Sequence, residues 1–327
     1  MSLKRRDLIG LALLLLATIT MEAFGQTSAT IQLKWVHQAQ FAGFYLAGEL
    51  GYYEDEGLDL SLLEGGPGVD KIDRLLAGEA DFCVDSIENL LLRREAGDDV
   101  VAVTVSFQRN PLVFTAKTDS GIETPQDCVG RTAAILGADY ADVQFYAMLD
   151  RLGLNPQSVD YSAYDFAHEA FYADEVDITL AYVNGGLIRM RTDGYDVVTL
   201  WPGDYGVLLY ADALITTREM IQNHPEVVES VIRATIRGWE DAVLDPEGAL
   251  ETILLYAADS DENMQRAMIY ATVPLLAAEK HPVGWMDTEV WTQMINMMTQ
   301  YGVITALINP QLSYDTTFLE AIYAEED

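Results

Sequence analysis

The feature that most constrains the fold is an alternation of strand-like and helix-like segments, which runs along the chain twice. Residues 30–35 alternate apolar and polar side chains, as a half-buried strand does. Residues 100–105 are almost continuously apolar, which is typical of a strand buried on both faces. Strands that alternate with helices at this spacing predict βαβ units and a mainly parallel α/β sheet. In the first unit we expect strands at 30–35, 58–63, 80–84 and 100–105, and helices at 41–50, 70–77 and 86–96.

The alternation restarts after residue 107, and this predicts a second α/β unit over about 107–205. From residue 210 the pattern changes to one strand followed by long helices. The expected strands are 112–116, 132–136, 159–161, 178–182, 197–200 and 214–217; the expected helices are 140–152, 225–244, 246–258, 260–276 and 287–301. A chain of 327 residues has the length of about two domains.

The first 25 residues are predicted to be a signal peptide. Basic residues at 4–6 precede an apolar stretch at 8–21, and small side chains at Ala23 and Gly25 fit a cut before Gln26. An uncleaved N-terminal anchor and a twin-arginine signal are the alternatives. The rest of the chain contains no second apolar segment long enough for a membrane span. We therefore expect an exported, soluble, periplasmic or extracytoplasmic protein.

The charge of the chain excludes one class of partner. Nineteen basic residues stand against 52 acidic ones, which gives a formal net charge of −33. Such a surface repels phosphate backbones, so nucleic-acid binding is not expected. Two cysteines, Cys83 and Cys128, are too few for a disulfide scaffold or a cysteine-based zinc site, and we expect both to be inert thiols.

A series of short motifs, in a fixed order, resembles a known family. The segment 33–47 (LKWVHQAQFAGFYLA) is the most extended of them. The others are Gly51-Tyr52-Tyr53, residues 56–59, residues 78–82, Gly121-Ile122 with Pro125 and Asp127, residues 204–206, residues 223–226 and residues 237–239. Together they resemble the NMT1/THI5-like group of periplasmic solute-binding proteins of ABC importers, which includes binders of thiamine-precursor pyrimidines, riboflavin binders and fungal pyrimidine synthases. The resemblance covers essentially the whole mature chain.

The resemblance implies a periplasmic-binding-protein fold of type II: two α/β lobes, joined by two crossover strands, that close on a ligand in the cleft. Residues 1–25 would be the signal peptide. Lobe 1 would be discontinuous, with residues 27–106 and 208–327, and lobe 2 would be residues 107–207. The alternation of the sequence agrees with this division. Carboxyl ends of strands and helix N-termini would then face the cleft.

Candidate ligand contacts follow from this placement. Trp35 would stack on a flat heterocycle, and polar side chains at the other strand ends would bind its nitrogens and carbonyls. Structural roles stay open for each: Trp35, Phe41 and Tyr45 in the core, Ser86 as a helix N-cap, and the others as turn or loop residues. The predicted ligand-binding residues are Trp35, His37, Gln40, Phe41, Tyr45, Asp85, Ser86, Gln108, Asp139, Tyr182, Asn184 and Tyr205.

The sequence does not predict an enzyme. It contains no paired histidines at helical zinc spacing and no G-x-S-x-G nucleophile turn, so we expect no catalytic residues, metal or cofactor. The fungal synthases carry a cofactor-binding Lys, a catalytic His and a Cys-rich run. Alignment on residues 78–81 puts Asp85 and Asn89 at the Lys and His positions, and residues 205–209 contain no Cys.

The predicted function is therefore that of an exported, monomeric solute-binding protein, whose partners are a heterocyclic ligand and an ABC permease with its ATPase. A thiamine-precursor pyrimidine is the first candidate ligand; riboflavin or another aromatic compound is the alternative. Gln40-Phe41 stand where typical pyrimidine binders carry Asn-His, and this version resembles sensory input domains. A sensory subunit that docks a membrane kinase is thus a further alternative, as is a pyrimidine synthase.

Overall fold

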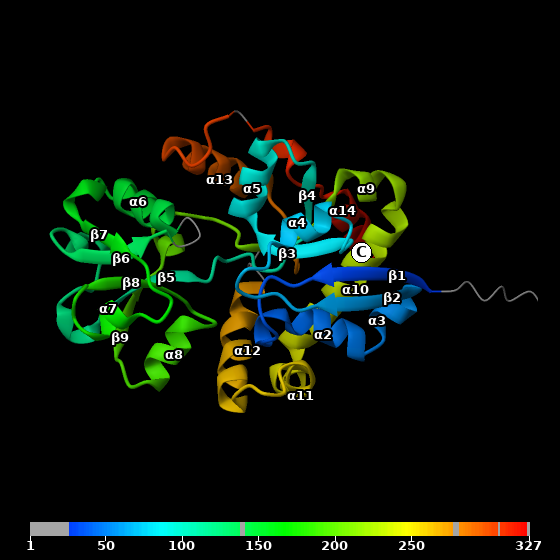
Figure 1. Ribbon diagram of the computed structural model, residues 1–327, viewed down its shortest axis with the longest axis horizontal. Helices are drawn as coiled ribbons and strands as arrows, with labels where there is room; N and C mark the ends of the chain where they lie inside the picture. The colour runs from blue at the N-terminus through cyan, green and yellow to red at the C-terminus, as the bar shows by residue number, and fades with distance from the viewer. Residues whose placement is uncertain (1–25, 138–140, 277–280, 307, 326–327) are drawn as a thin grey trace, which may run out of the picture.

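The computed structural model describes residues 26–137, 141–276, 281–306 and 308–325, and they form two α/β lobes side by side (Figure 1). Lobe 1 is built on a five-stranded sheet with the order β2-β1-β3-β10-β4. Its strands are β1 (Thr27–Gln32), β2 (Leu58–Leu63), β3 (Phe82–Ser86), β4 (Val100–Val105) and β10 (Asp212–Thr217).

Lobe 2 is built on a second five-stranded sheet with the order β7-β6-β8-β5-β9. All of its strands come from the stretch between the two halves of lobe 1. They are β5 (Leu112–Lys117), β6 (Thr132–Leu136), β7 (Asp160–Ala163), β8 (Ile178–Tyr182) and β9 (Val197–Leu200).

Both sheets follow the predicted parallel pattern with one strand reversed. β10 runs antiparallel to β3 and β4, and β5 runs antiparallel to β8 and β9. These two strands are the first in the sequence after each passage of the chain between the lobes. The chain therefore enters each new sheet in the reverse direction, which the local pattern of apolar residues did not indicate.

Long-range pairing also moves the ends of two strands. We expected β1 at 30–35, but it pairs residue for residue with β2 and ends with its partner at Gln32. We expected β3 at 80–84, but pairing with β10 extends it to Ser86. Asp85 and Ser86 are consequently the last residues of a strand, and Ser86 is also the N-cap of the helix that follows.

Helices cover both faces of each sheet (Figure 1). Those of the first half are η1 (Ala39–Phe41), α2 (Ala42–Glu49), α3 (Tyr52–Asp55), α4 (Lys71–Leu76) and α5 (Ile87–Ala96). Those of lobe 2 and the passage that leaves it are η2 (Thr118–Ser120), η3 (Pro125–Cys128), α6 (Ala141–Arg151), η4 (Pro156–Ser158), α7 (Glu169–Tyr172), α8 (Gly186–Thr192) and η5 (Pro202–Tyr205). The last are α9 (Arg218–Asn223), α10 (Pro225–Leu244), α11 (Pro246–Tyr256), α12 (Glu262–Leu276), α13 (Thr288–Gln300), η6 (Pro310–Leu312) and α14 (Thr317–Ala324).

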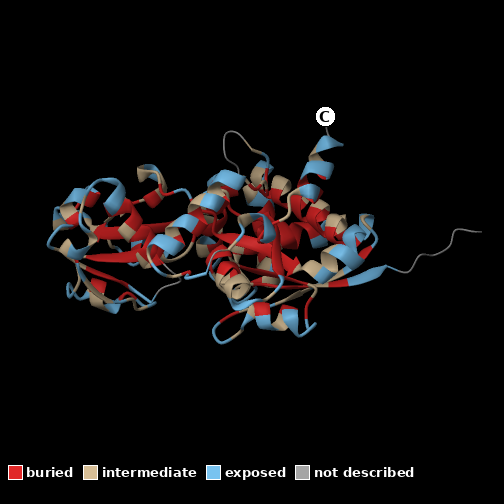
Figure 2. Cartoon of the chain, turned by 90° about the horizontal axis from the view of Figure 1, so that it is seen from above, coloured by how far each residue is buried: buried red, intermediate tan, exposed pale blue. Residues whose placement is uncertain are grey.

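The core of lobe 1 depends on a close approach of α2 and α10. A Cβ atom at Gly43 would lie 2.2 Å from the Trp239 indole, and one at Gly238 would lie 2.1 Å from the carbonyl oxygen of Gly43. Both positions therefore exclude any side chain. Buried residues run through both sheets and along these helices (Figure 2).

Two C-terminal helices reach from lobe 1 toward lobe 2. α12 packs against η1 and also against α8, and α13 packs against α6 (Figure 1). Among the residues that the structure describes, no helix combines the length and the apolar character that crossing a bilayer requires. The predicted signal peptide lies outside those residues.

Candidate functional site

The site is built where β1 and β2 end side by side. The amide of Gly65 donates to the carbonyl oxygen of Trp35 over 3.0 Å, and Gly65 leaves no room for a Cβ against the backbone of Leu33. The two loops thus pack backbone against backbone, which fixes the direction of Trp35. Its side chain is 39% exposed, unusual for a Trp, and offers an aromatic surface to a ligand.

An ion pair, with its aspartate buried and its lysine partly buried, starts at the residue before Trp35. Lys34 Nζ is 2.8 Å from Asp212 Oδ1, and Gln40 Nε2 donates to Asp212 Oδ2 over 2.5 Å. Asp212 is 3% exposed and begins β10. Burial opposes the charge on Lys34, but Asp212, Tyr182 and Asp85 outweigh it and raise the pKa of Lys34. The lysine is therefore a fixed cation with further N–H groups to offer.

Sequence reasoning missed Lys34 and Asp212, although it found Gln40. The signal for Lys34 was its place next to Trp35 at a strand end. No local signal marked Asp212, because only the return of the chain from lobe 2 brings it to Lys34.

Asp85 is held by its own neighbours. It accepts hydrogen bonds from the Ser86 amide (2.8 Å) and from Asn89 Nδ2 (2.6 Å), and Lys71 Nζ lies 3.7 Å away. Burial raises the pKa of Asp85, while Lys34 and Lys71 oppose that shift. Ser86 caps α5 by accepting from the Asn89 amide. These contacts fix the strand end, and Asp85 adds to the raised pKa of Lys34.

His37 joins the loop to an aromatic stack. Its Nδ1 is 3.0 Å from the Tyr45 hydroxyl, and its backbone amide donates to Glu64 Oε1 over 3.0 Å. Tyr45 stacks on Tyr256 with ring centroids 4.2 Å apart. Burial lowers the pKa of His37, with Glu64 in opposition, so the ring favours its neutral form. Tyr45 and Phe41 are fully buried, and the structure gives them packing roles.

Lobe 2 contributes the end of β8. Tyr182, at the end of β8, adds to the raised pKa of Lys34. Asn184 is 5% exposed, and its Nδ2 donates to Thr272 Oγ1 of α12 over 3.2 Å. On the same helix, Gln265 Oε1 accepts a hydrogen bond from the Ala39 amide over 2.7 Å. α12 thereby ties the loop after β1 to the turn after β8.

The other predicted residues lie elsewhere. The backbone amide of Gln108 donates to Leu275 O of α12 over 2.8 Å, and its side chain donates to Pro282 O. Tyr205 ends η5, which packs against α6, and burial raises the pKa of its hydroxyl, with Asp204 and Cys128 adding to the shift. It does not join the group around Trp35. Asp139 lies outside the described residues.

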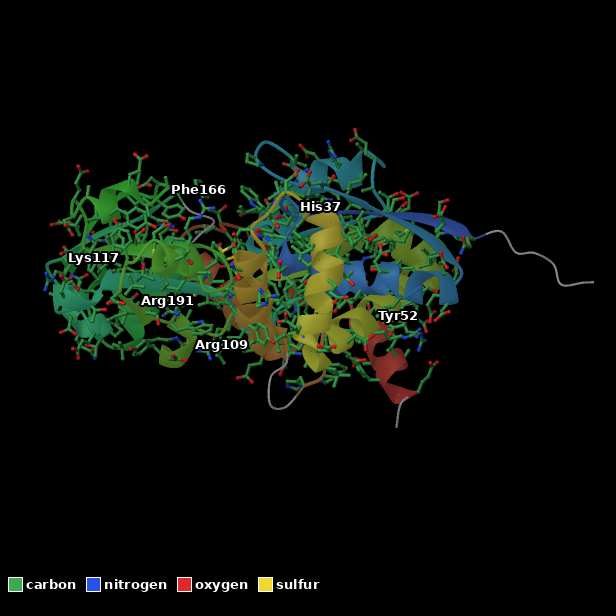
Figure 3. All side chains as sticks on the ribbon, turned by 90° about the horizontal axis from the view of Figure 1, so that it is seen from below. His37, Tyr52, Arg109, Lys117, Phe166 and Arg191 are labelled. Atoms are coloured by element: carbon green, nitrogen blue, oxygen red, sulfur yellow. The ribbon has the colours of Figure 1, made fainter. Side chains whose placement is uncertain are left out.

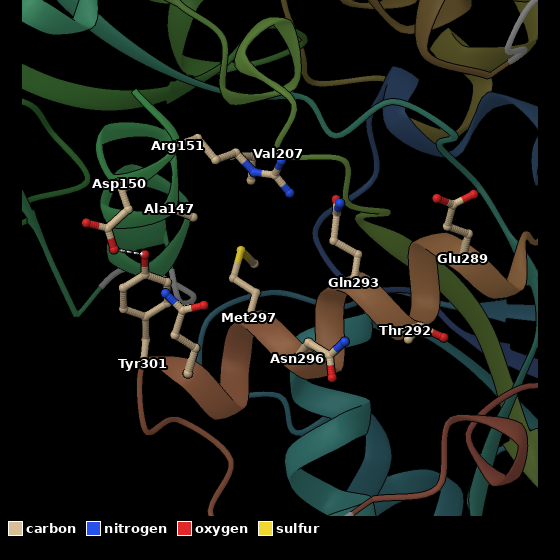
Figure 4. Close-up of a pocket in the computed structure, with 11 residues that line it drawn as sticks. Ala147, Asp150, Arg151, Val207, Glu289, Thr292, Gln293, Asn296, Met297 and Tyr301 are labelled. Carbon is tan, nitrogen blue, oxygen red and sulfur yellow. Dashed lines mark hydrogen bonds between the residues drawn. The ribbon is translucent and has the colours of Figure 1, made fainter. Parts of the chain in front are cut away.

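Two hollows lie between the lobes, both apart from Trp35. One, of about 710 Å³, separates α6 from α13; there Arg151 and Gln293 reach in from opposite sides, and Tyr301 donates to Asp150 (Figure 4). The other, of about 440 Å³, lies against the two passages of the chain between the lobes. Among the described residues, no cluster of His, Cys, Asp or Glu is placed to hold a metal ion. Cys83 and Cys128 are both buried.

Comparison with known proteins defines first the fold and then the family. The sulfonate-binding protein SsuA from Methylobacillus flagellatus superimposes with a TM-score of 0.72 at 12% identity, over 92% of this chain and 95% of that one. The two-lobed architecture is thus that of the periplasmic binding proteins. The family model described as NMT1/THI5 like matches residues 38–249, and the chain belongs to that family.

Two of the relatives that cover most of the chain are binding proteins by name. The riboflavin-binding protein RibY of Chloroflexus aurantiacus is 25% identical over 303 residues, which is 89% of this chain and 85% of that protein. The formylaminopyrimidine-binding protein of Halalkalibacterium halodurans is 24% identical, over 82% of this chain and 83% of that protein.

Proposed function

We propose that this protein is an exported solute-binding protein of an ABC importer, and that its ligand contains a pyrimidine ring. The observation that carries the proposal is the exposed Trp35 ring next to the Lys34–Asp212 pair. An indole face suits a flat ring, and the neighbouring N–H and carboxylate groups suit its nitrogens and carbonyls.

The names of the two relatives support the same chemistry. Formylaminopyrimidine is an aminopyrimidine, and the isoalloxazine of riboflavin ends in a pyrimidinedione. A thiamine-precursor pyrimidine is the first candidate and riboflavin the second, and both would bring a pyrimidine edge to Lys34. The cation at Lys34 favours a ring with an outward carbonyl or ring nitrogen, since an ammonium group can only donate.

Closure of the lobes is the proposed mechanism. Ligand contacts from both sides would favour the closed arrangement, in which α12 joins Ala39 to Asn184. The closed form would then deliver the ligand to a membrane permease and its ATPase. This places the mature protein outside the cytoplasm and assigns it no catalytic role.

The test is a thermal-shift screen of the mature chain from Gln26, followed by calorimetry on each hit. The panel holds 4-amino-5-hydroxymethyl-2-methylpyrimidine, formylaminopyrimidine and riboflavin, with an alkanesulfonate and amino acids as controls. A ligand at 100 times its Kd stabilises the fold by about 2.7 kcal/mol, a shift of a few degrees. The proposal would be overturned if the sulfonate bound and none of the three ring compounds did.

A further inference from the structure

The second hollow described above, which we call the hinge pocket, is lined by residues of both lobes and of both connecting passages. Lobe 2 contributes Gln144 of α6 and Trp201, and lobe 1 contributes Pro274 of α12 and Val290 of α13. Gln108 is the only predicted ligand-binding residue among its lining residues. The hinge pocket is thus distinct from the site around Trp35.

Hydrogen bonds hold the walls of the hinge pocket in place. Asn110 Nδ2 donates to Tyr210 O over 3.1 Å, its Oδ1 accepts from the Leu112 amide over 3.0 Å, and Trp201 Nε1 donates to Asn110 O over 2.8 Å. One side chain therefore ties the outgoing passage to the returning one. The volume of about 440 Å³ lies within the range of sites for small molecules, roughly 300–1,000 Å³.

The charged groups of the hinge pocket are paired with one another. Arg109 donates to Asp204 over 2.6 Å, and its guanidinium lies 3.4 Å from the centroid of the Trp201 ring. Figure 3 shows Arg109 where the two lobes meet. His281 Nε2 lies 3.3 Å from Asp287 Oδ2. Among the described lining residues, Arg109 and Asp204 thus offset each other's charge, and the stacked guanidinium and indole form a flat wall.

Gln144 is the exception to this pairing. It is 3% exposed, it lines the hinge pocket, and its side-chain amide makes no hydrogen bond with any residue that the structure describes. Its polar atoms are not among the fully buried side-chain atoms that lack a partner, so the amide is open to the hinge pocket, where a ligand would replace water as its partner. Its carbonyl and NH2 groups lie side by side and match a planar group that carries a donor next to an acceptor.

We propose that the hinge pocket is a second binding site, for a neutral planar aromatic amide or lactam whose amide edge pairs with Gln144. The ring would occupy the space along the Arg109–Trp201 wall. This proposal goes beyond the function proposed for the Trp35 site and does not depend on it.

The experiment is a titration of the full mature chain with benzamide, followed by NMR chemical shifts and calorimetry. Methyl benzoate, which has the same ring and carbonyl but no N–H donor, is the control ligand. We expect benzamide to bind at least ten times more tightly than methyl benzoate. Gln144→Leu keeps the size of the side chain and removes its polar edge, so it should abolish this preference without lowering the unfolding midpoint.

Two further variants make the outcome decisive. Gln300→Leu removes an amide from the other hollow and should leave benzamide binding unchanged. Trp35→Ala should also leave it unchanged, whether or not a pyrimidine or flavin binds at the first site. The proposal is overturned if benzamide does not bind at millimolar concentration. Water would then be the hydrogen-bonding partner of the Gln144 amide. Equal binding to wild type and Gln144→Leu, or loss of binding in Trp35→Ala, would overturn it as well.

Discussion

Lys34 and Trp35 are neighbours in sequence and have opposite environments. The lysine is drawn inward by Asp212, while the tryptophan stays exposed. The chain leaves the strand at Gln32 and bends at both residues. A fixed cation and a free aromatic ring consequently stand next to each other at the end of one strand.

Trp35→Ala should lower the affinity for the heterocycle at least tenfold, because the stacking surface is lost. The unfolding midpoint should change little, since the side chain is 39% exposed. Trp35→Phe keeps a ring and should retain most of the affinity. Calorimetry with the best ligand of the screen measures both variants. An unchanged Kd for Trp35→Ala would remove this residue from the site.

Lys34→Met should reduce the free energy of unfolding by about 3 kcal/mol, because it leaves Asp212 buried with only Gln40 as its partner. The double variant Lys34→Met/Asp212→Leu should recover most of that loss. Urea denaturation measures both. If the single and double variants were equally unstable, the ion pair would not be the cause.

The low pKa of His37 makes a pH-dependent contribution to stability. Burial, opposed by Glu64, puts the folded pKa below the unfolded value of 6.5. The contribution is therefore complete above pH 6.5 and declines as the pH falls below it. Thermal midpoints of wild type and His37→Gln should converge between pH 7.5 and pH 5. The exposed His224→Gln serves as control, and a constant difference for His37→Gln would contradict the assignment.

The sequence predicts candidate ligand contacts only where they lie on the chain next to a strand end. The pattern around Trp35, His37 and Gln40 pointed to one loop, and the structure ties that loop to Asp212 and to α12 of lobe 1. It could not reveal Asp212, which lies 172 residues after Gln40 and meets the loop only through the tertiary fold. Nor could it reveal Thr272, which lies 88 residues after Asn184 and accepts its hydrogen bond.

At the scale of elements, α2 contains two glycines with different surroundings. Gly43 lies against Trp239 of α10, whereas a Cβ at Gly48 would meet only the Tyr256 hydroxyl, at 3.5 Å. The same helix thus offers one position that excludes a methyl group and another that accepts it. Composition and helix propensity treat these two glycines alike, because the difference lies in α10.

Gly43→Ala should destabilise the protein by about 1–3 kcal/mol, because it forces α2 and α10 apart. Gly48→Ala should instead stabilise it by about 0.5–1 kcal/mol, as a helical glycine replaced without a clash does. Chemical denaturation of both variants gives the comparison. Effects of the same sign would show that α2 and α10 are not packed at this distance.

Strands were easier to predict than their directions. The strands expected at 58–63, 100–105, 132–136, 178–182 and 197–200 are present with those bounds, because each carries its apolar pattern locally. The reversal of β5 and β10 depends on how the chain passes between the lobes, and no window of sequence contains that information.

At the scale of the whole molecule, the lobes are joined by side chains as well as by the two passages. The Asn184–Thr272 hydrogen bond connects β8–α8 of lobe 2 to α12, and both residues are buried. α12 comes from the C-terminal half, yet it contacts both η1 and α8. The position of one helix therefore depends on the angle between the lobes.

Thr272→Val keeps the shape of the side chain and removes the acceptor of Asn184, so it should weaken ligand binding about three- to tenfold without touching the ligand. If Asn184 acts only through Thr272, adding Asn184→Ala to Thr272→Val should have no further effect. Calorimetry on the single and double variants gives this coupling. Fully additive losses would indicate that Asn184 contacts the ligand directly.

The late position of β10 affects how the protein folds as it is made. β10 is the fourth strand in the order of its sheet, between β3 and β4, but it is the last of the ten strands in the sequence. Lobe 2 is one uninterrupted stretch and can complete its sheet while the C-terminal third is still being synthesised. Lobe 1 cannot complete its sheet until β10, which ends at Thr217, and then α10 have been synthesised. A ribosome-bound chain therefore has an incomplete first sheet through most of its synthesis. Chaperones that recognise exposed apolar strands would find their substrate in the N-terminal segment, which is synthesised first and buried last.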